Sequence, residues 1–156
     1  MHQYIEPISQ LCWQAADAIM SFYDTDAEIV DKSDGSPLTK ADIASHQVIC
    51  HGLSTVTPEI PIISEESASP TQPHNHATFW LVDPLDGTKE FINKNGEFTV
   101  NIALIQNNKP VMGFVCCPAL NTLYYGIVRE GAYKAERGQP SQPIQISLED
   151  TDGLIV

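Results

Sequence analysis

The chain has 156 residues, of which 42% are hydrophobic and 18% charged, and its formal net charge at pH 7 is −12. This composition is typical of a soluble globular domain, and no apolar run is long enough to span a bilayer. The acidic balance argues against nucleic acid as a partner, because duplex binding needs clustered Lys and Arg, but it leaves a small phosphorylated ligand held through cations open.

The N-terminus and the cysteines both favour a cytoplasmic protein. Glu6 and Asp17 interrupt the first apolar positions, so we expect no secretory signal. The four cysteines, at positions 12, 50, 116 and 117, have no C-x-x-C spacing and are expected to be reduced, buried thiols. Peripheral association with the inner membrane face is left open.

The first elements in chain order are expected to be a helix and a polar connection. Apolar residues at three-and-four spacing predict an amphipathic helix over 4–23. Residues 24–36 indicate a loop or short hairpin that ends in Asp34-Gly-Ser-Pro37, and Pro37 is expected to end any continuing regular structure.

A second helix is predicted to begin after Thr39. Thr39 would be its N-cap, and Asp42, three residues on, resembles the acid of a capping box. We expect this helix to run to about Cys50, with Gly52 as its terminator.

The next stretch contains a short strand and an exposed loop. Residues 60–63 predict an apolar strand that leads into Ser64-Glu65-Glu66. Residues 67–77 are polar and Pro-rich. Their His74-x-His76 pair could in principle bind a metal, but an exposed loop is the favoured interpretation because no cysteine lies nearby.

From Phe79 onward, short apolar runs separated by turn signals predict an antiparallel meander. With the helices gathered at the N-terminal end, the fold class is α+β, with helices packed on an antiparallel sheet. The expected strands cover residues 79–82, 98–105, 111–117, 122–128, 132–136 and 144–147.

The segment Trp80-Leu-Val-Asp-Pro-Leu-Asp-Gly-Thr-Lys-Glu-Phe91 carries the main functional signal. Asp83 and Asp86 are separated by a short turn, so they can point at one centre, and Mg²⁺ prefers oxygen ligands of this kind. Gly87 and Thr88 follow, and a glycine beside a hydroxyl suits a phosphate oxygen that needs close backbone approach.

Two further loops present acids, so three loops could meet in one site. Their acids are Asp34 and Asp42, Glu65 and Glu66, and Asp83 and Asp86. Mutual repulsion makes such a cluster costly unless cations lie within it. Two metals roughly 3.5–4 Å apart can bind the attacking and leaving oxygens of a phosphoryl displacement.

In this interpretation each residue has a defined role. Glu65, Asp83, Asp86 and the Leu85 carbonyl oxygen would bind metal, while Asp42 and Thr88 would hold and deprotonate the attacking water. The ordinary structural explanations are that Asp42 is only a helix cap, Glu65-Glu66 a solvated strand end and Thr88 a turn hydroxyl.

Three motifs resemble, in order and spacing, the signatures of the inositol monophosphatase superfamily. They are Asp34-Gly-Ser-Pro-Leu-Thr-Lys-Ala-Asp42, Ile63-Ser-Glu-Glu66 and Trp80-Leu-Val-Asp-Pro-Leu-Asp-Gly-Thr88. The continuation Lys89-Glu-Phe91 and Asn95-Gly-Glu-Phe-Thr-Val-Asn-Ile-Ala-Leu104 is most similar to the CysQ-type 3′(2′),5′-bisphosphate nucleotidases of that superfamily.

The resemblance implies a Mg²⁺-dependent, lithium-sensitive phosphatase. Two or three Mg²⁺ ions are implied in the complete enzyme, with 3′-phosphoadenosine 5′-phosphate hydrolysed to AMP and phosphate in support of sulfate assimilation. By match to the family, Glu65, Leu85, Asp86, Gly87 and Thr88 also contact the substrate. Glu66 is implied to be an acid that acts without touching the metal.

The implied fold is a layered αβαβα sandwich, of which residues 1–156 would be the first part. The family's C-terminal Trp-Asp-x-Ala-Ala segment is absent from these residues, and Ala16 replaces a frequent glycine in the first helix. We therefore expect a C-terminal domain outside this chain, weak Mg²⁺ binding and slow turnover by residues 1–156 alone, and self-association through an exposed apolar face.

Two alternatives stay open. The same metal cluster with a different pocket would hydrolyse inositol 1-phosphate or fructose 1,6-bisphosphate. A non-catalytic binding or assembly module could also retain this scaffold.

Overall fold

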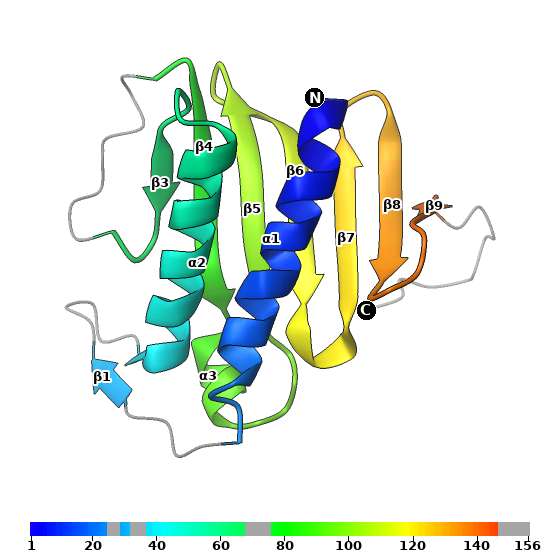
Figure 1. Cartoon of the computed structure of the whole chain (residues 1–156). Coiled ribbons are helices and arrows are strands. Elements are labelled where there is room, and N and C mark those ends of the chain that lie inside the picture. Colours follow the sequence, from blue (N-terminus) through cyan, green and yellow to red (C-terminus); the bar gives the residue numbers. More distant parts are fainter. Residues whose placement is uncertain (25–28, 32–36, 68–75, 147–156) are drawn as a thin grey trace, which may run out of the picture.

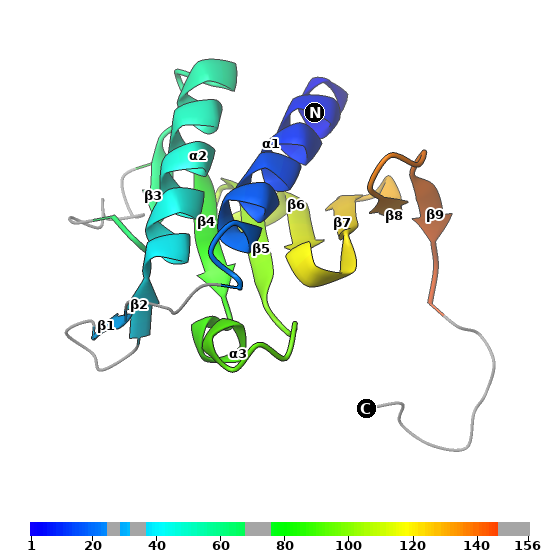
Figure 2. The same cartoon turned by 60° about the horizontal axis from the view of Figure 1, so that its bottom comes forward.

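The computed structural model describes residues 1–24, 29–31, 37–67 and 76–146. Helices α1 (His2–Met20) and α2 (Lys40–Val56) lie side by side on one face of a seven-stranded sheet (Figure 1). Viewed from below, both helices remain on the same side of the sheet (Figure 2). The predicted α+β class, with N-terminal helices on a largely antiparallel sheet, is confirmed.

The sheet has the order β3-β4-β5-β6-β7-β8-β9. From β4 onward every neighbour is antiparallel and sequential, so the predicted meander is confirmed. The first pair is different, because β3 runs parallel to β4. The strands are β3 (Ile62–Ser64), β4 (Thr78–Asp86), β5 (Thr99–Gln106), β6 (Lys109–Cys117), β7 (Thr122–Ile127), β8 (Gly131–Glu136) and β9 (Gln142–Ile144).

Two short strands and two short helices complete the described chain. Strands β1 (Ile29–Asp31) and β2 (Pro37–Thr39) pair antiparallel, so the hairpin alternative for this region is the one observed. The expectation that Pro37 ends regular structure is wrong, because it begins β2, where a proline at the first position of a strand is tolerated. The others are α3 (Thr88–Ile92) and the 3₁₀ helix η2 (Pro118–Leu120), neither of which was predicted.

The core lies between the helices and the sheet. Trp80, Phe98 and Phe114 are fully buried there, together with apolar residues of α1 and α2. The indole N–H of Trp80 donates to Thr57 Oγ1 at 2.8 Å, which pairs a polar atom that burial would otherwise leave unsatisfied. Ala16 is buried in α1 on this same face.

The opposite face of the sheet has no helix over it among the described residues, and several of its apolar side chains reach the surface. Leu81 is 46% exposed, Val115 40% and Tyr124 37%. We call this the helix-free face. No helix within the described part of the chain is both long and apolar enough to cross a membrane.

The cysteines are free thiols, as predicted, but the expected burial holds only for Cys12 and Cys116, since Cys50 and Cys117 are partly exposed. Burial raises the pKa of Cys12 and lifts that of Cys116 to about 12. These buried thiols therefore stay protonated and unreactive.

Helix α2 begins as predicted but ends later. Thr39 is its N-cap, and the capping box with Asp42 is present. The predicted end near Cys50 is wrong, since the helix continues to Val56 with Thr57 as C-cap. Gly52 lies inside the helix, and packing against α1 explains why this residue is a glycine. A Cβ at this position would come within 2.4 Å of Leu11 Cδ1 on α1.

We expect G52V to lower the free energy of unfolding by about 1–3 kcal/mol, the usual cost of overpacking a filled core. The added side chain would meet Leu11, which is 4% exposed and has little room to move. Urea unfolding followed by circular dichroism measures the change.

The matched control is S54V, which places the same side chain on an exposed position of the same helix. Because L11A removes the atoms that clash, the double variant L11A/G52V should cost less than the sum of the single variants. Strict additivity would show that Gly52 is not held by contact with Leu11.

Candidate active site

The site begins with a β-bulge in β4. Asp83 lies opposite Asn101 on β5 and Asp86 lies opposite Thr99, with a register shift between the two acids. Side chains alternate along a regular strand, so residues three apart would point to opposite faces. The bulge adds one residue on β4 only, and both acids therefore share the helix-free face with Asn101 and Thr99.

The sequence of the bulge explains why the strand departs from regularity there. Pro84 has no N–H to give to a ladder, and prolines within sheets are confined to edges and bulges. Its carbonyl oxygen accepts a hydrogen bond from Ser45 Oγ on α2 at 2.7 Å. Leu85 is buried beside it. Helix α2 thus anchors the bulge from the opposite side of the sheet.

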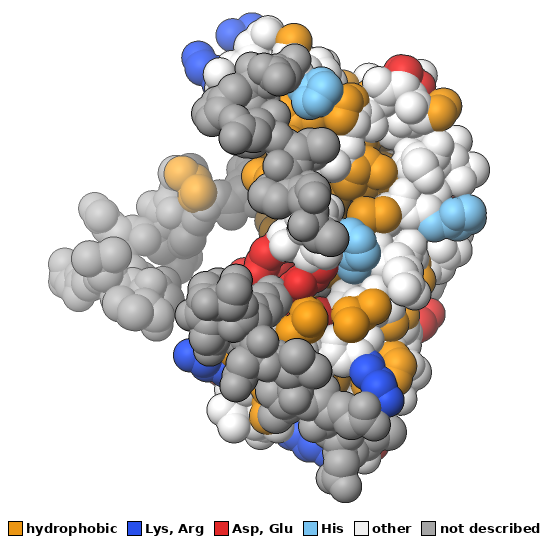
Figure 3. Space-filling view, turned by 90° about the vertical axis from the view of Figure 1, so that its left-hand side faces the viewer, with side chains coloured by type: hydrophobic (Ala, Val, Ile, Leu, Met, Phe, Trp, Pro, Cys, Tyr) orange, Lys and Arg blue, Asp and Glu red, His pale blue; other side chains and the backbone are white. Residues whose placement is uncertain are grey.

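Strand β3 brings Glu65 to the same face. In the parallel ladder Ile63 lies opposite Leu81 and Ser64 opposite Val82, and the Glu65 N–H donates to the Val82 carbonyl at 3.0 Å. Because side chains alternate along a strand, Ser64 points toward α2 and Glu65 points to the face that carries Asp83. Figure 3, which views the molecule from its β3 side, shows acidic side chains gathered at one place, with hydrophobic side chains around them.

The acids repel one another strongly. Burial, followed by the negative charges of Glu65 and Asp86, raises the pKa of Asp83 to about 7. Asp83 Oδ1 is buried and has no hydrogen-bond partner among the described residues. A buried carboxylate oxygen without a donor, beside two further acids, is an environment that a hard divalent cation would stabilise.

The carboxylates do not, however, form a finished metal cage. Within the described ranges, no three His, Cys, Asp or Glu side chains converge closely enough to hold an ion. The donor types and their shared face fit Mg²⁺, and the Leu85 carbonyl supplies a neutral oxygen between the acids. Binding would require the carboxylates to move toward a common centre.

Asp42 joins the helix start to the bulge. It is fully buried at the first turn of α2. Its Oδ2 accepts from both the backbone N–H and the hydroxyl of Thr39, and its Oδ1 accepts from Thr88 Oγ1 at 3.1 Å. Thr88 Oγ1 also lies 3.3 Å from the Leu85 carbonyl oxygen. The capping role and the predicted pairing with Thr88 therefore use different oxygens of one carboxylate.

Gly87 makes the turn from β4 into α3. Its φ of +89° lies in the left-handed region that favours glycine. A Cβ at this position would also come within 2.9 Å of the Glu97 carbonyl oxygen. The turn therefore requires glycine for its backbone conformation and for the close approach of the Glu97 backbone, while the phosphate contact stays a prediction.

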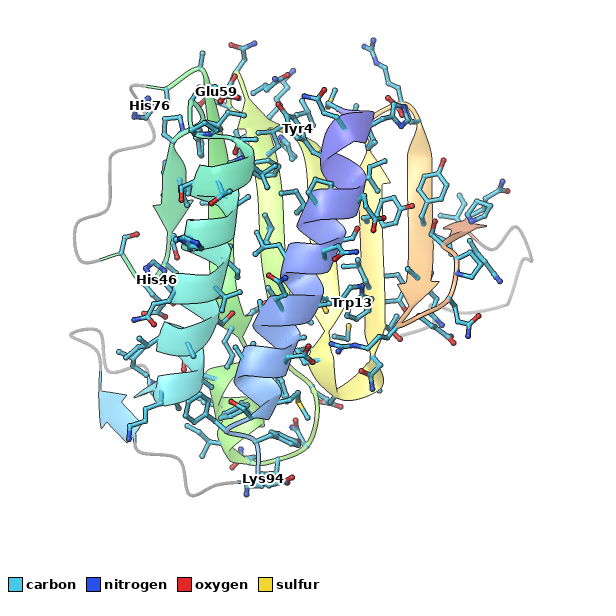
Figure 4. The ribbon with its side chains drawn as sticks, viewed as in Figure 1. Tyr4, Trp13, His46, Glu59, His76 and Lys94 are labelled. Carbon is cyan, nitrogen blue, oxygen red and sulfur yellow. The ribbon has the colours of Figure 1, made fainter. Side chains whose placement is uncertain are left out.

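The predicted site residues fall into two groups. The structure brings Glu65, Asp83 and Asp86 to one face, and Asp42 to Thr88 behind the bulge. Asp34 and His74 lie outside the described residues. His76 lies at the end of the sheet opposite to α3, away from these acids (Figure 4). Glu66 is half-buried beside Glu65, and its role stays a prediction.

Sequence reasoning missed the polar side chains that hold the acids. Besides Ser45, these include Asn101, which donates to Asp86, and His46, whose Nδ1 lies 2.9 Å from the hydroxyl of buried Ser64. Figure 4 shows His46 on the side of α2 nearest β3. All three lie within regular elements, where no turn or acid-rich motif marks them.

A hollow of about 520 Å³ adjoins the acids on the helix-free face. The polar residues that line it are Ser64, Glu65, Asp83 and Asn101, and the remainder is apolar, including Leu81 and Val115. The acids thus lie at the edge of an apolar depression, which places charge and apolar surface within reach of one ligand.

We expect D83N to stabilise the metal-free protein at pH 8. Asp83 has a pKa of about 7 when folded against 3.8 in the reference state, so the folded chain binds the extra proton between these values. Wild-type stability therefore falls relative to D83N as pH rises from about 4 to about 7, and the difference is largest above pH 7. Urea unfolding in chelator from pH 5 to 8 measures this trend.

The control is E59Q, an exposed acid at the opposite end of the sheet from α3 (Figure 4). It removes one negative charge without relieving the cluster, so its effect should change little with pH. A D83N variant that is less stable than wild type at pH 8 would contradict the repulsion described here.

Comparison with known proteins gives consistent matches. The sequence profile of the inositol monophosphatase family matches residues 1–155. The protein named 3′(2′),5′-bisphosphate nucleotidase CysQ from Salmonella typhimurium is 52% identical over 142 residues, which cover 88% of this chain and 57% of that protein.

Solved structures agree in fold. The crystal structure of CysQ from Bacteroides thetaiotaomicron superposes with a TM-score of 0.71 at 38% identity, covering 94% of this chain and 52% of that one. The suhB protein of Bartonella henselae gives a TM-score of 0.82 at 23% identity, covering 94% and 55%, and shows likeness of fold alone. The chain thus spans little more than half the length of these relatives.

Proposed function

Because the chain belongs to the inositol monophosphatase family, we propose that it carries the acidic half of a Mg²⁺-dependent phosphatase site. The observation that carries this proposal is the bulge that places Asp83 and Asp86 on one face with Glu65, directly in front of the Asp42–Thr88 pair. These residues supply oxygen ligands for a cation and a route for a proton.

The proposed ligands are Glu65, Asp83, Asp86 and the carbonyl oxygen of Leu85. Bound Mg²⁺ would supply Lewis acidity, which polarises the phosphoryl group and lowers the pKa of a nearby water. The buried, unpartnered Oδ1 of Asp83 would gain the electrostatic partner that it lacks among the described residues. Two or three ions are proposed in the complete enzyme.

The Asp42–Thr88 pair would move the proton. The single hydroxyl hydrogen of Thr88 is directed at Asp42 Oδ1 or the Leu85 carbonyl, so its lone pairs are free to accept a hydrogen bond from water. As that water attacks, Thr88 Oγ1 takes its proton and passes its own to Asp42 Oδ1. Thr39 holds the other oxygen of Asp42 throughout, which keeps the carboxylate in place.

The backbone of Gly87 and Thr88 would contact the phosphate. Gly87 has no side chain to block approach, and its N–H and that of Thr88 begin α3. The first N–H groups of a helix lack intrahelical partners and point toward an incoming oxygen. This arrangement would orient the phosphate over the acids.

The proposed substrate is 3′-phosphoadenosine 5′-phosphate, which would give AMP and phosphate in support of sulfate assimilation. The 52% identical relative is named a 3′(2′),5′-bisphosphate nucleotidase, and this name favours a nucleotide over inositol 1-phosphate or fructose 1,6-bisphosphate. Lithium sensitivity belongs to the same proposal.

We expect calorimetry to detect Mg²⁺ binding by the 156-residue chain at pH 8 and no binding by D83N. Removing one carboxylate takes away a ligand and leaves the other acids without their shared partner. E59Q is the control and should bind as wild type does. Equal Mg²⁺ binding by D83N and wild type would refute the proposed ligand set.

Phosphate release then tests the reaction and the substrate. With Mg²⁺, release from 3′-phosphoadenosine 5′-phosphate should exceed that from inositol 1-phosphate and fructose 1,6-bisphosphate. D83N should lower it at least about 100-fold, the scale set by losing one strong electrostatic contact to the transition state. We propose that residues 1–156 alone turn over slowly and bind Mg²⁺ weakly. Rapid phosphate release would contradict the slow turnover and leave the proposed reaction standing.

A non-catalytic assembly module is the remaining alternative. It predicts that D83N leaves the protein's role intact and that none of the three substrates releases phosphate. Self-association through the helix-free face, where Leu81 is 46% exposed, and a cytoplasmic location are further parts of the proposal.

A further inference from the structure

One polar side chain on the acidic face has no place in the mechanism above. Asn101 lies on β5 opposite Asp83, and its Nδ2 donates to Asp86 Oδ2 at 3.2 Å. It is half-buried and lines the hollow beside the acids. This one amide is therefore a ladder neighbour of the first acid of the bulge and a hydrogen-bond donor to the second.

The amide is hydrogen-bonded at both ends. Thr99 Oγ1 donates to Asn101 Oδ1 at 3.3 Å, and Thr99 is the residue opposite Asp86 in the ladder. An ionised carboxylate can only accept, so Asp86 selects the orientation in which the NH₂ group faces it, and the Thr99 hydroxyl then donates to the amide oxygen at the other end. The reverse orientation would turn the amide oxygen toward the negative charge of Asp86.

Asp86 needs such a restraint. Its side chain is exposed, so rotation into solvent would relieve repulsion from Asp83 at little steric cost. A neutral donor opposes that rotation without cancelling any negative charge. A lysine or arginine would also hold the carboxylate, but its positive charge would compete with a bound cation.

We propose that Asn101 is a positioning residue, which holds the Asp86 carboxylate beside Asp83 for cation binding, and that the Thr99 hydroxyl restrains the other end of its amide. The inference rests on the function proposed for this site, and it assigns roles to two residues outside the predicted ligand set. The bulge makes the arrangement possible because it puts all four side chains on one face.

Calorimetric titration with Mg²⁺ at pH 8 tests the inference without relying on catalysis. N101A should weaken Mg²⁺ affinity by about 10- to 100-fold, the usual effect of removing a group that orients a metal ligand. T99V, which removes the hydroxyl at nearly constant shape, should weaken it by about tenfold or less, while T99S should bind as wild type does. T55V, at an exposed threonine of α2, is the matched control.

Urea unfolding of each variant and the Mg²⁺ dependence of phosphate release separate positioning from simple structural support. N101A should raise the Mg²⁺ concentration for half-maximal rate more than it lowers the rate at saturating Mg²⁺. A purely structural role would lower stability while leaving Mg²⁺ affinity unchanged.

The outcomes distinguish this inference from the function on which it rests. Mg²⁺ binding that D83N abolishes but N101A leaves unchanged would overturn the role of Asn101 and leave the proposed function standing. Weaker binding by T99S as well as T99V would overturn the role of the Thr99 hydroxyl. Equal Mg²⁺ affinity of D83N and the unaltered chain would overturn the proposed ligand set and this inference together.

Discussion

The bulge in β4 is the constraint on which the candidate site depends. Without its extra residue, strand alternation would turn Asp86 toward the helix-covered side of the sheet, where Trp80 and Val82 are buried. A charged carboxylate there would lose its hydration among apolar side chains. Pro84 disrupts the regular ladder, and Ser45 pairs the carbonyl that the bulge would otherwise leave unsatisfied. A packing feature of α2 thus determines on which face the acids lie.

Asp42 shows that a structural and a chemical explanation need not compete. A fully buried carboxylate is costly unless it is well hydrogen-bonded, and the structure directs two donors from Thr39 and one from Thr88 at it. The Thr39 contacts begin the helix, while the Thr88 contact ties that helix to the turn after β4. The same bonds that stabilise the fold hold a potential proton acceptor at a fixed position behind the acidic face.

Features encoded locally could be predicted from the sequence, and features set by distant contacts could not. Neighbouring residues determine the capping box at Thr39, the turns between the later strands and the acids around Pro84, and the structure places these features as expected. The exception is β4, which continues through the bulge to Asp86 instead of ending at Val82. The prediction that Gly52 ends the helix is wrong because glycine is needed there for contact with Leu11, which lies on another helix. The parallel pairing of β3 was missed because its partner strand follows a long connection. Asn101 looks like any polar residue of an alternating strand, since its hydrogen-bond partner Asp86 shares its face only because of the bulge.

The two faces of the sheet have different roles, because one buries the main core and the other carries the acidic side chains. The helix-covered face buries Trp80, Phe98 and Phe114 in one continuous core, and this burial offsets the repulsion collected on the other face. Burial of Asp83, followed by that repulsion, raises its pKa to about 7, so ionising this carboxyl at neutral pH costs free energy when no cation is bound. Ser45 links the two faces, because it lies on the buried side and donates a hydrogen bond to the Pro84 carbonyl in the bulge that presents the acids. A site that is costly when empty gains the most from a cation, since binding removes the repulsion as well as adding new contacts. That cost in the metal-free fold is therefore part of what would make this face selective for positive charge.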